Sequence, residues 1–267
     1  MPELDPAIQA YHERGSEAGR LTGGLPSGPL ELERTRELIL RAVPPPPLRV
    51  LDVGGGAGIH ASWLAEHGYD VHLIDPVSFH IEQALNDGRF SAALGDARDL
   101  PVDAGAYDVV LLLGPLSHLL DPSDRALALR EARRALRPGG LLFAAAIARY
   151  AALLDLLVRL DRLHTEGEME AVTHAVRTGA FHGARHGMFT NAYFHLPSEL
   201  QTEIVDAGFA QPSIFTVEGP GFLVPDLEQR WADPARRRTL LDAARLVESD
   251  PEMLAAASHL LAVTHRP

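Results

Sequence analysis

Short apolar runs alternate with segments of helical spacing through the first half of the chain. The apolar runs predict strands at 49–53, 71–75, 90–94, 107–113 and 141–147, and helices are expected between them. The run 107–113 is almost wholly apolar, which suits a strand buried on both faces of a parallel sheet. The pattern therefore predicts a doubly wound α/β sheet, in which ligands bind at the carboxyl ends of the strands.

The segments outside this alternation are less regular. A helix is expected at 31–43, and the prolines at 44–47 form a stiff spacer after it. In the second half, the predicted helices lie at 151–163, 166–178, 197–207 and 226–248, and the predicted strands at 213–218 and 259–264. Residues 179–190 combine three glycines with polar side chains and are expected to form a mobile loop.

A glycine-rich turn follows the first predicted strand. Gly54, Gly56 and Gly58 let the backbone turn sharply and let a ligand approach, because no Cβ stands in the way. A dinucleotide fingerprint needs G-x-G-x-x-G, and counted from Gly54 its third glycine would fall on Ile59. The pattern that fits is Asp52 followed by the three alternating glycines.

Four further motifs follow the turn in order. They are Asp75 after the second strand, Gly95-Asp96-Ala97 after the third, Tyr107-Asp108 with its apolar run in the fourth, and Leu136-Arg137-Pro138-Gly139-Gly140 before the fifth. Together with the turn, they resemble the five motifs of the class I S-adenosylmethionine-dependent methyltransferases, over roughly residues 48–147. The resemblance implies a Rossmann-like, seven-stranded sheet that ends in an antiparallel hairpin.

The resemblance also implies a division of the chain. Residues 1–47 would be an N-terminal helical flap and proline linker, and residues 48–267 the cofactor-binding domain. Helical insertions at about 148–196 and 220–257 would form a lid that shapes the substrate pocket.

S-adenosylmethionine is the cofactor that the resemblance implies, with Asp75 on its ribose hydroxyls and the glycine turn near its amino-acid part. Adenine would meet Asp96 or a backbone amide at Ala97 or Arg98, and Tyr11, Arg14 and Arg20 would form a flap. The cofactor-binding set is Asp52, Gly54, Gly56, Gly58, Asp75, Pro76, Asp96, Ala97, Leu113, Tyr11 and Arg20. An acidic surrounding suits a cationic cofactor.

Each of these roles has a structural alternative. Asp75 would then only cap the following helix, and Asp52 would be a buried acid that holds the turn. Asp96 would be a plain turn residue. The N-terminal flap would be a disordered tail.

Three histidines are candidates for a general base. His118 follows the fourth strand, where the family places residues that face the methyl group, and histidine titrates near neutrality. His182 and His186 lie in the glycine-rich loop with Arg185, which would bind an anionic acceptor. Alternatively, His118 packs against the cofactor or starts a helix, and the loop that holds the other two histidines is only solvated. Glu218 is expected either to touch substrate or to form a turn.

Composition limits the classes of partner. The chain carries a formal charge of −12 without a long basic run, which disfavours nucleic acid. It has no cysteine, and its histidines lack a metal-like spacing, so no metal is expected. No signal peptide or membrane span is recognised. We therefore expect a soluble, cytoplasmic monomer or homodimer.

The predicted function is methyl transfer from S-adenosylmethionine to a small metabolite or natural product. Two alternatives stay open: an enzyme of the same fold that catalyses a non-methylating step such as cyclisation, and a cofactor-binding protein without turnover. A nicotinamide-dependent enzyme is the fourth possibility, after methyl transfer and these two alternatives.

Overall fold

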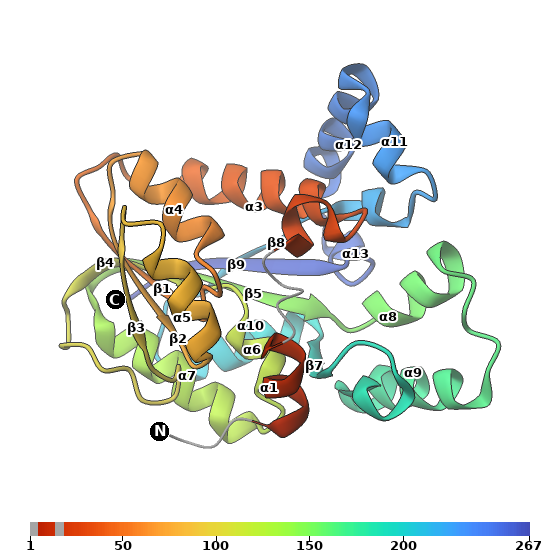
Figure 1. The fold of residues 1–267 in the computed structure, drawn as a ribbon, viewed down its shortest axis with the longest axis horizontal. Helices are drawn as coiled ribbons and strands as arrows, with labels where there is room; N and C mark the ends of the chain where they lie inside the picture. Colours follow the sequence, from red (N-terminus) through yellow and green to blue (C-terminus); the bar gives the residue numbers. More distant parts are fainter. Residues whose placement is uncertain (1–4, 14–18) are drawn as a thin grey trace.

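The protein is described by a computed structural model that covers residues 5–13 and 19–267. Helices cover both faces of one mixed sheet (Figure 1). Its strands are β1 (Arg49–Val53), β2 (Asp70–Asp75), β3 (Ser91–Leu94), β4 (Tyr107–Leu112), β5 (Leu136–Ala148), β6 (Ala180–His182), β7 (Asn191–His195), β8 (Ser213–Thr216) and β9 (His259–His265). In the described ranges they run β3-β2-β1-β4-β5-β7-β6, and β9 pairs with both β5 and β8.

The strand directions bring one set of strand ends together. Strands β3, β2, β1, β4 and β5 are parallel neighbours, so their carboxyl ends meet at one edge of the sheet. Strand β9 is antiparallel to β5, with His259 opposite Ile147. The first residue of β9 therefore lies at this same carboxyl edge, although it comes near the end of the chain.

Two layers of helices form separate cores on the sheet. Helices α3 (Gly28–Ala42), α4 (Ile59–Glu66) and α5 (Ser78–Leu85) cover one face, and α7 (Pro122–Ala135) and α10 (Pro197–Asp206) cover the other. Within β4, Val109 and Leu111 enter the core with Trp63 of α4. Val110 and Leu112 enter the opposite core. Burial on both sides explains the unbroken apolar run of β4.

Helix α7, before β5, starts with a side-chain cap. The Asp121 side chain accepts a hydrogen bond from the Ser123 N–H at 2.8 Å, and Pro122 occupies the first turn. The motif at 136–140, however, lies within β5 rather than before it. Tyr107 pairs with Leu136 and Val109 with Leu141, so the extra residues form an irregularity in that strand.

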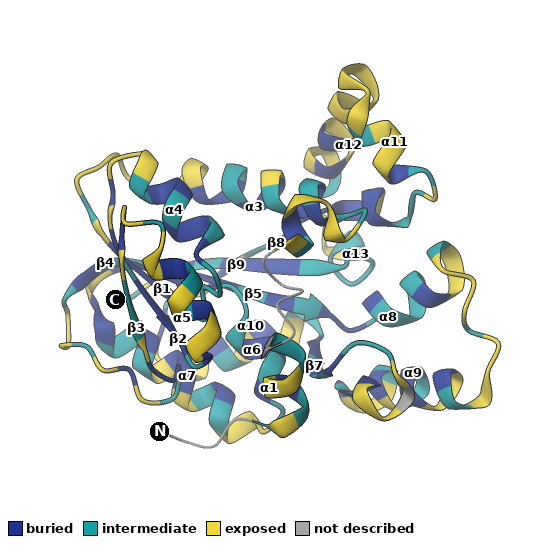
Figure 2. Cartoon of the chain, in the orientation of Figure 1, coloured by how far each residue is buried: buried dark blue, intermediate teal, exposed yellow. Residues whose placement is uncertain are grey.

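Each long insertion contributes to a small apolar cluster, and that of the second insertion is shared with α3. The first contains α8 (Ala151–Leu154), η2 (Asp155–Arg159), α9 (Glu166–Thr178), β6, η3 (Gly183–His186) and β7. The second contains η4 (Gly219–Leu223), α11 (Leu227–Ala232), α12 (Pro234–Val247) and α13 (Pro251–Leu254). Figure 2 shows that α11 and α12 are mostly exposed, whereas the sheet is mostly buried. Leu240 and Leu241 nevertheless pack with Leu30 of α3, which anchors the second insertion.

Several details differ from the sequence-based expectation. Within the described residues the sheet has nine strands instead of the expected seven, because residues 179–190 are not simply a loop: they include β6, which pairs with a second additional strand, β7. Phe181 and Phe194 stack at 5.0 Å between ring centroids, and this apolar contact holds the hairpin together.

Two helices are also shorter in the structure than the sequence predicted. The segment 151–163 is α-helical over Ala151–Leu154, continues as a π-helix over Asp155–Arg159 and ends there. The helix expected at 226–248 is interrupted at Asp233, whose side chain accepts hydrogen bonds from the N–H groups of Ala235 and Arg236. This capping starts a new helix, α12, at Pro234.

The N-terminal segment forms α1 (Pro6–Glu13) and a π-turn, η1 (Arg20–Gly24), before α3. Ile8 of α1 is buried, so this helix packs against the body of the protein. Among the helices of the described residues, none combines the length and the apolar character that crossing a membrane requires.

Candidate functional site

The glycine turn between β1 and α4 stands at the carboxyl edge. Gly54 and Gly58 have φ of +69° and +91°, and a Cβ on them would come within 2.7 Å of Pro115 and 2.4 Å of Phe90. Gly56 also has a positive φ, of +58°, but a Cβ there would meet no atom within 4 Å. Gly54 and Gly58 are thus fixed by packing, while Gly56 borders open space in which a ligand can approach the backbone.

Asp75 connects the end of β2 to the glycine turn. Its Oδ2 accepts a hydrogen bond from the Gly56 N–H at 2.9 Å. Its Oδ1 accepts from the Val77 N–H at 2.9 Å and lies 3.0 Å from Nδ1 of His80. The carboxylate therefore organises the turn and the start of α5, and the predicted ribose contact would have to share or replace the Gly56 bond.

Asp52 is the second buried carboxyl of this region. Burial, followed by the negative charge of Asp75, raises the pKa of Asp52 to about 7. In the described part of the chain no hydrogen-bond donor reaches its Oδ2, and a Cβ on Gly55 would lie 2.6 Å from that atom. A buried carboxyl oxygen without a donor suits a positively charged ligand group, such as an ammonium.

The third predicted acidic residue has a local partner. Both oxygens of Asp96 are engaged by Arg98, with Nε and a terminal nitrogen at 2.9 and 2.8 Å, and the Arg98 N–H donates to Oδ1 at 2.8 Å. Because Asp96 is engaged by Arg98 in this way, the predicted adenine contact at Asp96 or Ala97 stays a prediction. Pro76 and Leu113 lie half-buried at the ends of β2 and β4, where the resemblance places cofactor contacts.

His118 ends the short helix α6 (Pro115–His118) beside these groups. Its ring lies 4.8 Å from that of His12 and 6.2 Å from that of Phe189. Burial, followed by the nearby charges of His12 and Arg20, lowers the pKa of His118 to about 3. The imidazole is therefore neutral at physiological pH but weakly basic, which fits a proton acceptor poorly.

Helix α1 brings the predicted Tyr11 to the same edge. Its ring packs edge-on against Phe189 at 5.1 Å, and the neighbouring His12 contacts His80 at 5.4 Å. Asp5 accepts a hydrogen bond from the Asn191 amide at 3.3 Å. The N-terminal helix thus lies against both the cofactor-side residues and the β6–β7 hairpin. Arg14 lies outside the described residues.

The predicted site residues of the β6–β7 hairpin do not all lie beside the other predicted site residues. His182 is on β6, and its ring lies 5.4 Å from His174 of α9 rather than against His118. Burial and the charge of Arg185 lower the pKa of His182. Arg185 itself is exposed, and the side chain of His186 lies outside the described part of the structure.

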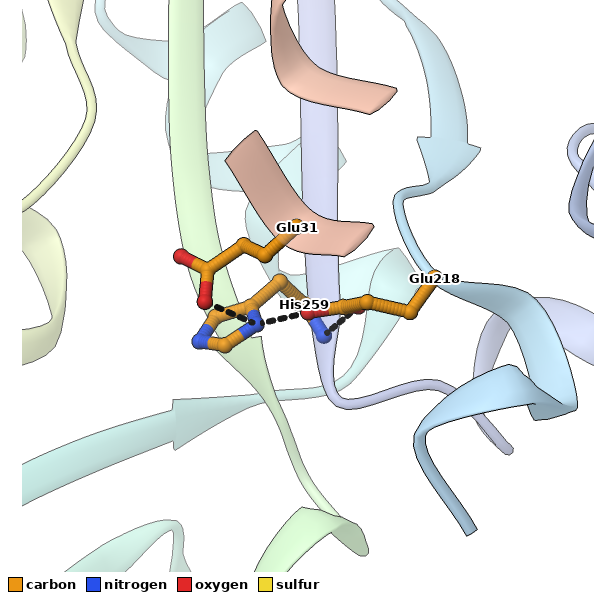
Figure 3. A group of neighbouring side chains, drawn as sticks. All are labelled: Glu31, Glu218 and His259. Atoms are coloured by element: carbon orange, nitrogen blue, oxygen red, sulfur yellow. Dashed lines mark hydrogen bonds and ion pairs between the residues drawn. The ribbon is translucent and has the colours of Figure 1, made fainter. Parts of the chain in front are cut away.

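A group of charged side chains at the far side of the edge escaped sequence reasoning (Figure 3). His259 Nδ1 lies 2.5 Å from Glu218 Oε1, and the His259 N–H donates to Glu218 Oε2 at 3.1 Å. Glu31 Oε2 is 3.7 Å from the same Nδ1. Arg20, predicted as a cofactor residue, forks onto Glu31 with bonds of 2.6 and 2.9 Å.

We call Arg20, Glu31, Glu218 and His259 the edge network. The two carboxylates raise the pKa of His259 to about 9 despite its burial. Arg20 and His259 hold the pKa of Glu31 down at about 2, against the effect of burial. The ligand atoms of Glu31, Glu218 and His259 lie within 4.8 Å of one another, as in a metal site. In the edge network, however, the cations Arg20 and His259 already neutralise the carboxylates of Glu31 and Glu218.

No sequence spacing joins residues 20, 31, 218 and 259, so local motifs gave no indication of the network. The one usable sign was Glu218, which the sequence places after a strand. The structure shows it fully buried, and a buried carboxylate requires a partner.

Residues 50–140 match the family described as a methyltransferase domain. The chain is 37% identical over 131 residues to an uncharacterized methyltransferase of Mycobacterium tuberculosis, an overlap that covers 48% of this chain and 49% of that one. It is 37% identical over 107 residues to a ubiquinone biosynthesis O-methyltransferase of Methylocella silvestris, covering 38% and 41%. The chain thus spans half or less of the length of the curated relatives it matches.

Solved structures share the fold over most of the chain. A methyltransferase from Thermotoga maritima, described as a possible histamine N-methyltransferase, has a TM-score of 0.59 at 16% identity and covers 98% of this chain and 99% of that one. A [4+2]-cyclase has a TM-score of 0.54 at 18% identity, covering 87% and 80%.

The family match, the relatives and the fold agree with the motif order. Residues 50–140 thus match a methyltransferase domain, and the chain is similar in sequence and in fold to S-adenosylmethionine-dependent methyltransferases.

Proposed function

We propose that this protein transfers a methyl group from S-adenosylmethionine to a small-molecule acceptor at the carboxyl edge of its sheet. The observation that carries the proposal is the group formed by Asp52, Gly56 and Asp75. It joins an open backbone approach at Gly56 to two buried carboxyls, one of which has an oxygen without a donor in the described chain. Such a group suits a ligand with hydroxyls and a positive charge.

The residues fit this cofactor in distinct ways. Asp75 would accept the ribose hydroxyls, and Asp52 would face the ammonium end. When bound, the cofactor supplies the electrophilic methyl group, so the protein's task is to hold an acceptor behind the carbon–sulfur bond. Orientation of this kind contributes about 7–11 kcal/mol in favourable cases.

The acceptor side is proposed to lie among α6, the β6–β7 hairpin and the edge network. The M. silvestris relative is named for ubiquinone biosynthesis, which supports a small acceptor with a hydroxyl group. Both insertions border this side, and α1 lies across it. A pocket enclosed in this way would favour a metabolite over a macromolecule.

The test is a screen of small acceptors with a methyl-labelled donor, followed by mass spectrometry of all products. We expect S-adenosylhomocysteine and a methylated product in equal amounts. The Asp75→Ala variant should lose turnover, and Asp70→Ala, at the exposed start of the same strand, should retain it.

The same screen separates the second candidate function. The fold is shared with a [4+2]-cyclase, so the fold alone does not decide between transfer and cyclisation. Conversion of a substrate without consumption of the donor would favour the cyclase reading. Tight donor binding without any turnover across the panel would favour a non-catalytic role.

A further inference from the structure

The edge network leaves one imidazole nitrogen pointing outward. Figure 3 shows the ring of His259 with Nδ1 facing the two glutamates and Nε2 on the opposite side. Among the residues that the structure describes, Nε2 has no hydrogen-bond partner, and it is not among the buried polar atoms. The side chain of His259 is 21% exposed. Nε2–H is therefore a donor available to a ligand.

The surroundings keep this donor charged and fixed. Glu218 contacts the ring at Nδ1 through one oxygen and accepts a hydrogen bond from the His259 backbone N–H through the other, so its carboxylate is fixed against the ring. The charged groups that face the ring are Glu31 from α3, Glu218 after β8 and Arg20 from η1. Arg20 is held on Glu31, so the four charges cancel and the imidazolium needs no further anion to be stable.

The edge network lies close to the part of the edge where the acceptor is proposed to bind. His259 pairs with Ile147 at the end of β5, and the Ile147 N–H donates to Ser117 Oγ at 3.1 Å. Ser117 adjoins His118, so the network lies one strand away from the α6 residues that follow β4. Arg20 is near enough to lower the pKa of both His118 and His60. The network therefore borders the acceptor side of the edge.

We propose that His259 binds the acceptor through an anionic oxygen, a carboxylate or a phenolate, which accepts a hydrogen bond from Nε2–H. This inference rests on the proposed function and adds the chemical class of its acceptor. Hydrogen bonds between two charged groups are among the stronger ones in proteins. Glu218, Glu31 and Arg20 are positioning residues, because they act only through the imidazolium.

The chemistry balances without a proton acceptor. The anionic oxygen forms a bond to the methyl carbon, the carbon–sulfur bond breaks, and its electron pair stays on sulfur. One negative oxygen and one positive sulfonium are converted into a neutral ester or ether and a neutral thioether. His259 keeps its proton throughout, and the step needs no base, which agrees with the lowered pKa of His118.

The test uses the full chain labelled with ¹⁵N at histidine. Benzoate, 4-nitrophenolate and butylammonium are titrated separately, each with and without S-adenosylhomocysteine. We expect one or both anions to shift the Nε2 resonance of His259 and butylammonium to leave it unchanged. In His259→Asn, anion affinity should fall about 10–100-fold, as expected for a charged hydrogen bond.

Controls separate this role from a structural one. His265→Asn alters an exposed histidine at the other end of β9 and should bind both anions like the wild type. If His259→Asn fails to fold, Glu218→Gln keeps the imidazole but weakens its hold on the proton. That variant should bind the anions less tightly and show a neutral His259 at lower pH than the wild type.

The outcomes are distinct. Equal anion affinity in wild type and His259→Asn, or a response of His259 to butylammonium alone, would overturn the inference. Failure of S-adenosylhomocysteine to bind would instead overturn the proposed function, because the anions are also titrated without it. Once a substrate is found, His259→Asn should raise KM more than it lowers kcat. A base-labile methyl ester would identify the carboxylate, and a stable ether the phenolate.

Discussion

The carboxyl edge of the sheet consists of two regions built in opposite ways. The cofactor side, around Asp52, Gly56 and Asp75, comes from one stretch of about two dozen residues, β1 through β2. The acceptor side, around Glu31 and His259, comes from segments at both ends of the chain. The cofactor side is acidic, and one of its carboxyl oxygens, on Asp52, has no hydrogen-bond donor in the described chain. The acceptor side is an ion network in which the described positive and negative charges cancel.

The difference shows what each region has to do. A fixed cofactor can be met by a local loop whose glycines and acids stand at set spacings. The edge network, on the side proposed for the acceptor, is instead brought together only by folding. The functional proposal therefore rests on local geometry on one side and on long-range contacts on the other.

The largest expected effect concerns the glycines. Gly58→Val should destabilise the fold by roughly 2–5 kcal/mol, because its side chain would overlap Phe90 at a positive φ. Gly56→Ala has room for its methyl group and should cost only about 1–2 kcal/mol of backbone strain.

Urea denaturation measures both costs. Gly56→Ala should fold and yet bind S-adenosylmethionine poorly, since its methyl group occupies the approach to the backbone. Full binding by Gly56→Ala would show that the open space at Gly56 is not the cofactor's.

Alkaline pH should weaken the acceptor side. The pKa of His259 is raised from 6.5 to about 9, so its stabilisation is complete below 6.5 and is lost as the pH rises through 9. We expect the wild type to lose roughly 1–3 kcal/mol of unfolding free energy over this interval, the scale of a hydrogen bond to a charged group. Chemical denaturation at a series of pH values should show this slope, and His259→Asn should flatten it.

The cofactor side should respond at lower pH. Asp52 has its pKa raised from 3.8 to about 7, and a cationic ligand favours its ionised form. Cofactor affinity should therefore fall as the pH drops below 7, by up to about tenfold per pH unit. In Asp52→Asn this dependence should disappear. An unchanged pH profile in that variant would place the cofactor's charge elsewhere.

The smallest expected effect is at His118. A general base contributes about 10²–10⁴-fold, but an imidazole with its pKa lowered to about 3 should contribute much less. We expect His118→Asn to reduce kcat by less than about tenfold. Loss of a true general base would reduce kcat by about 10²–10⁴-fold. A larger loss, with cofactor affinity intact, would restore His118 as the proton acceptor.

Sequence reasoning worked where interactions are local. The order of β1 to β5 and the glycines of the turn follow from spacing, because each depends on neighbours within a few residues. Gly54, Gly56 and Gly58 all have the positive φ expected of a sharp glycine turn, whereas their role in cofactor binding stays a prediction.

It failed where distant segments decide the structure. Strand β6 was missed because its core contact, Phe181 on Phe194, is made across the hairpin and not along the strand. The break at Asp233 depends on a side-chain cap that competes with an otherwise continuous helical pattern. Arg20 was assigned to the cofactor, but its fork on Glu31 became visible only once the chain was folded.

The account's central claim is that Asp75 binds the cofactor at this edge, and calorimetric titration with S-adenosylhomocysteine tests it most directly. Asp75→Ala should weaken binding by about 1.5–3 kcal/mol, the cost of losing hydrogen bonds to a charged group. Asp70→Ala, on the same strand, should bind like the wild type. Equal affinity in Asp75→Ala and the wild type, both folded, would contradict the account.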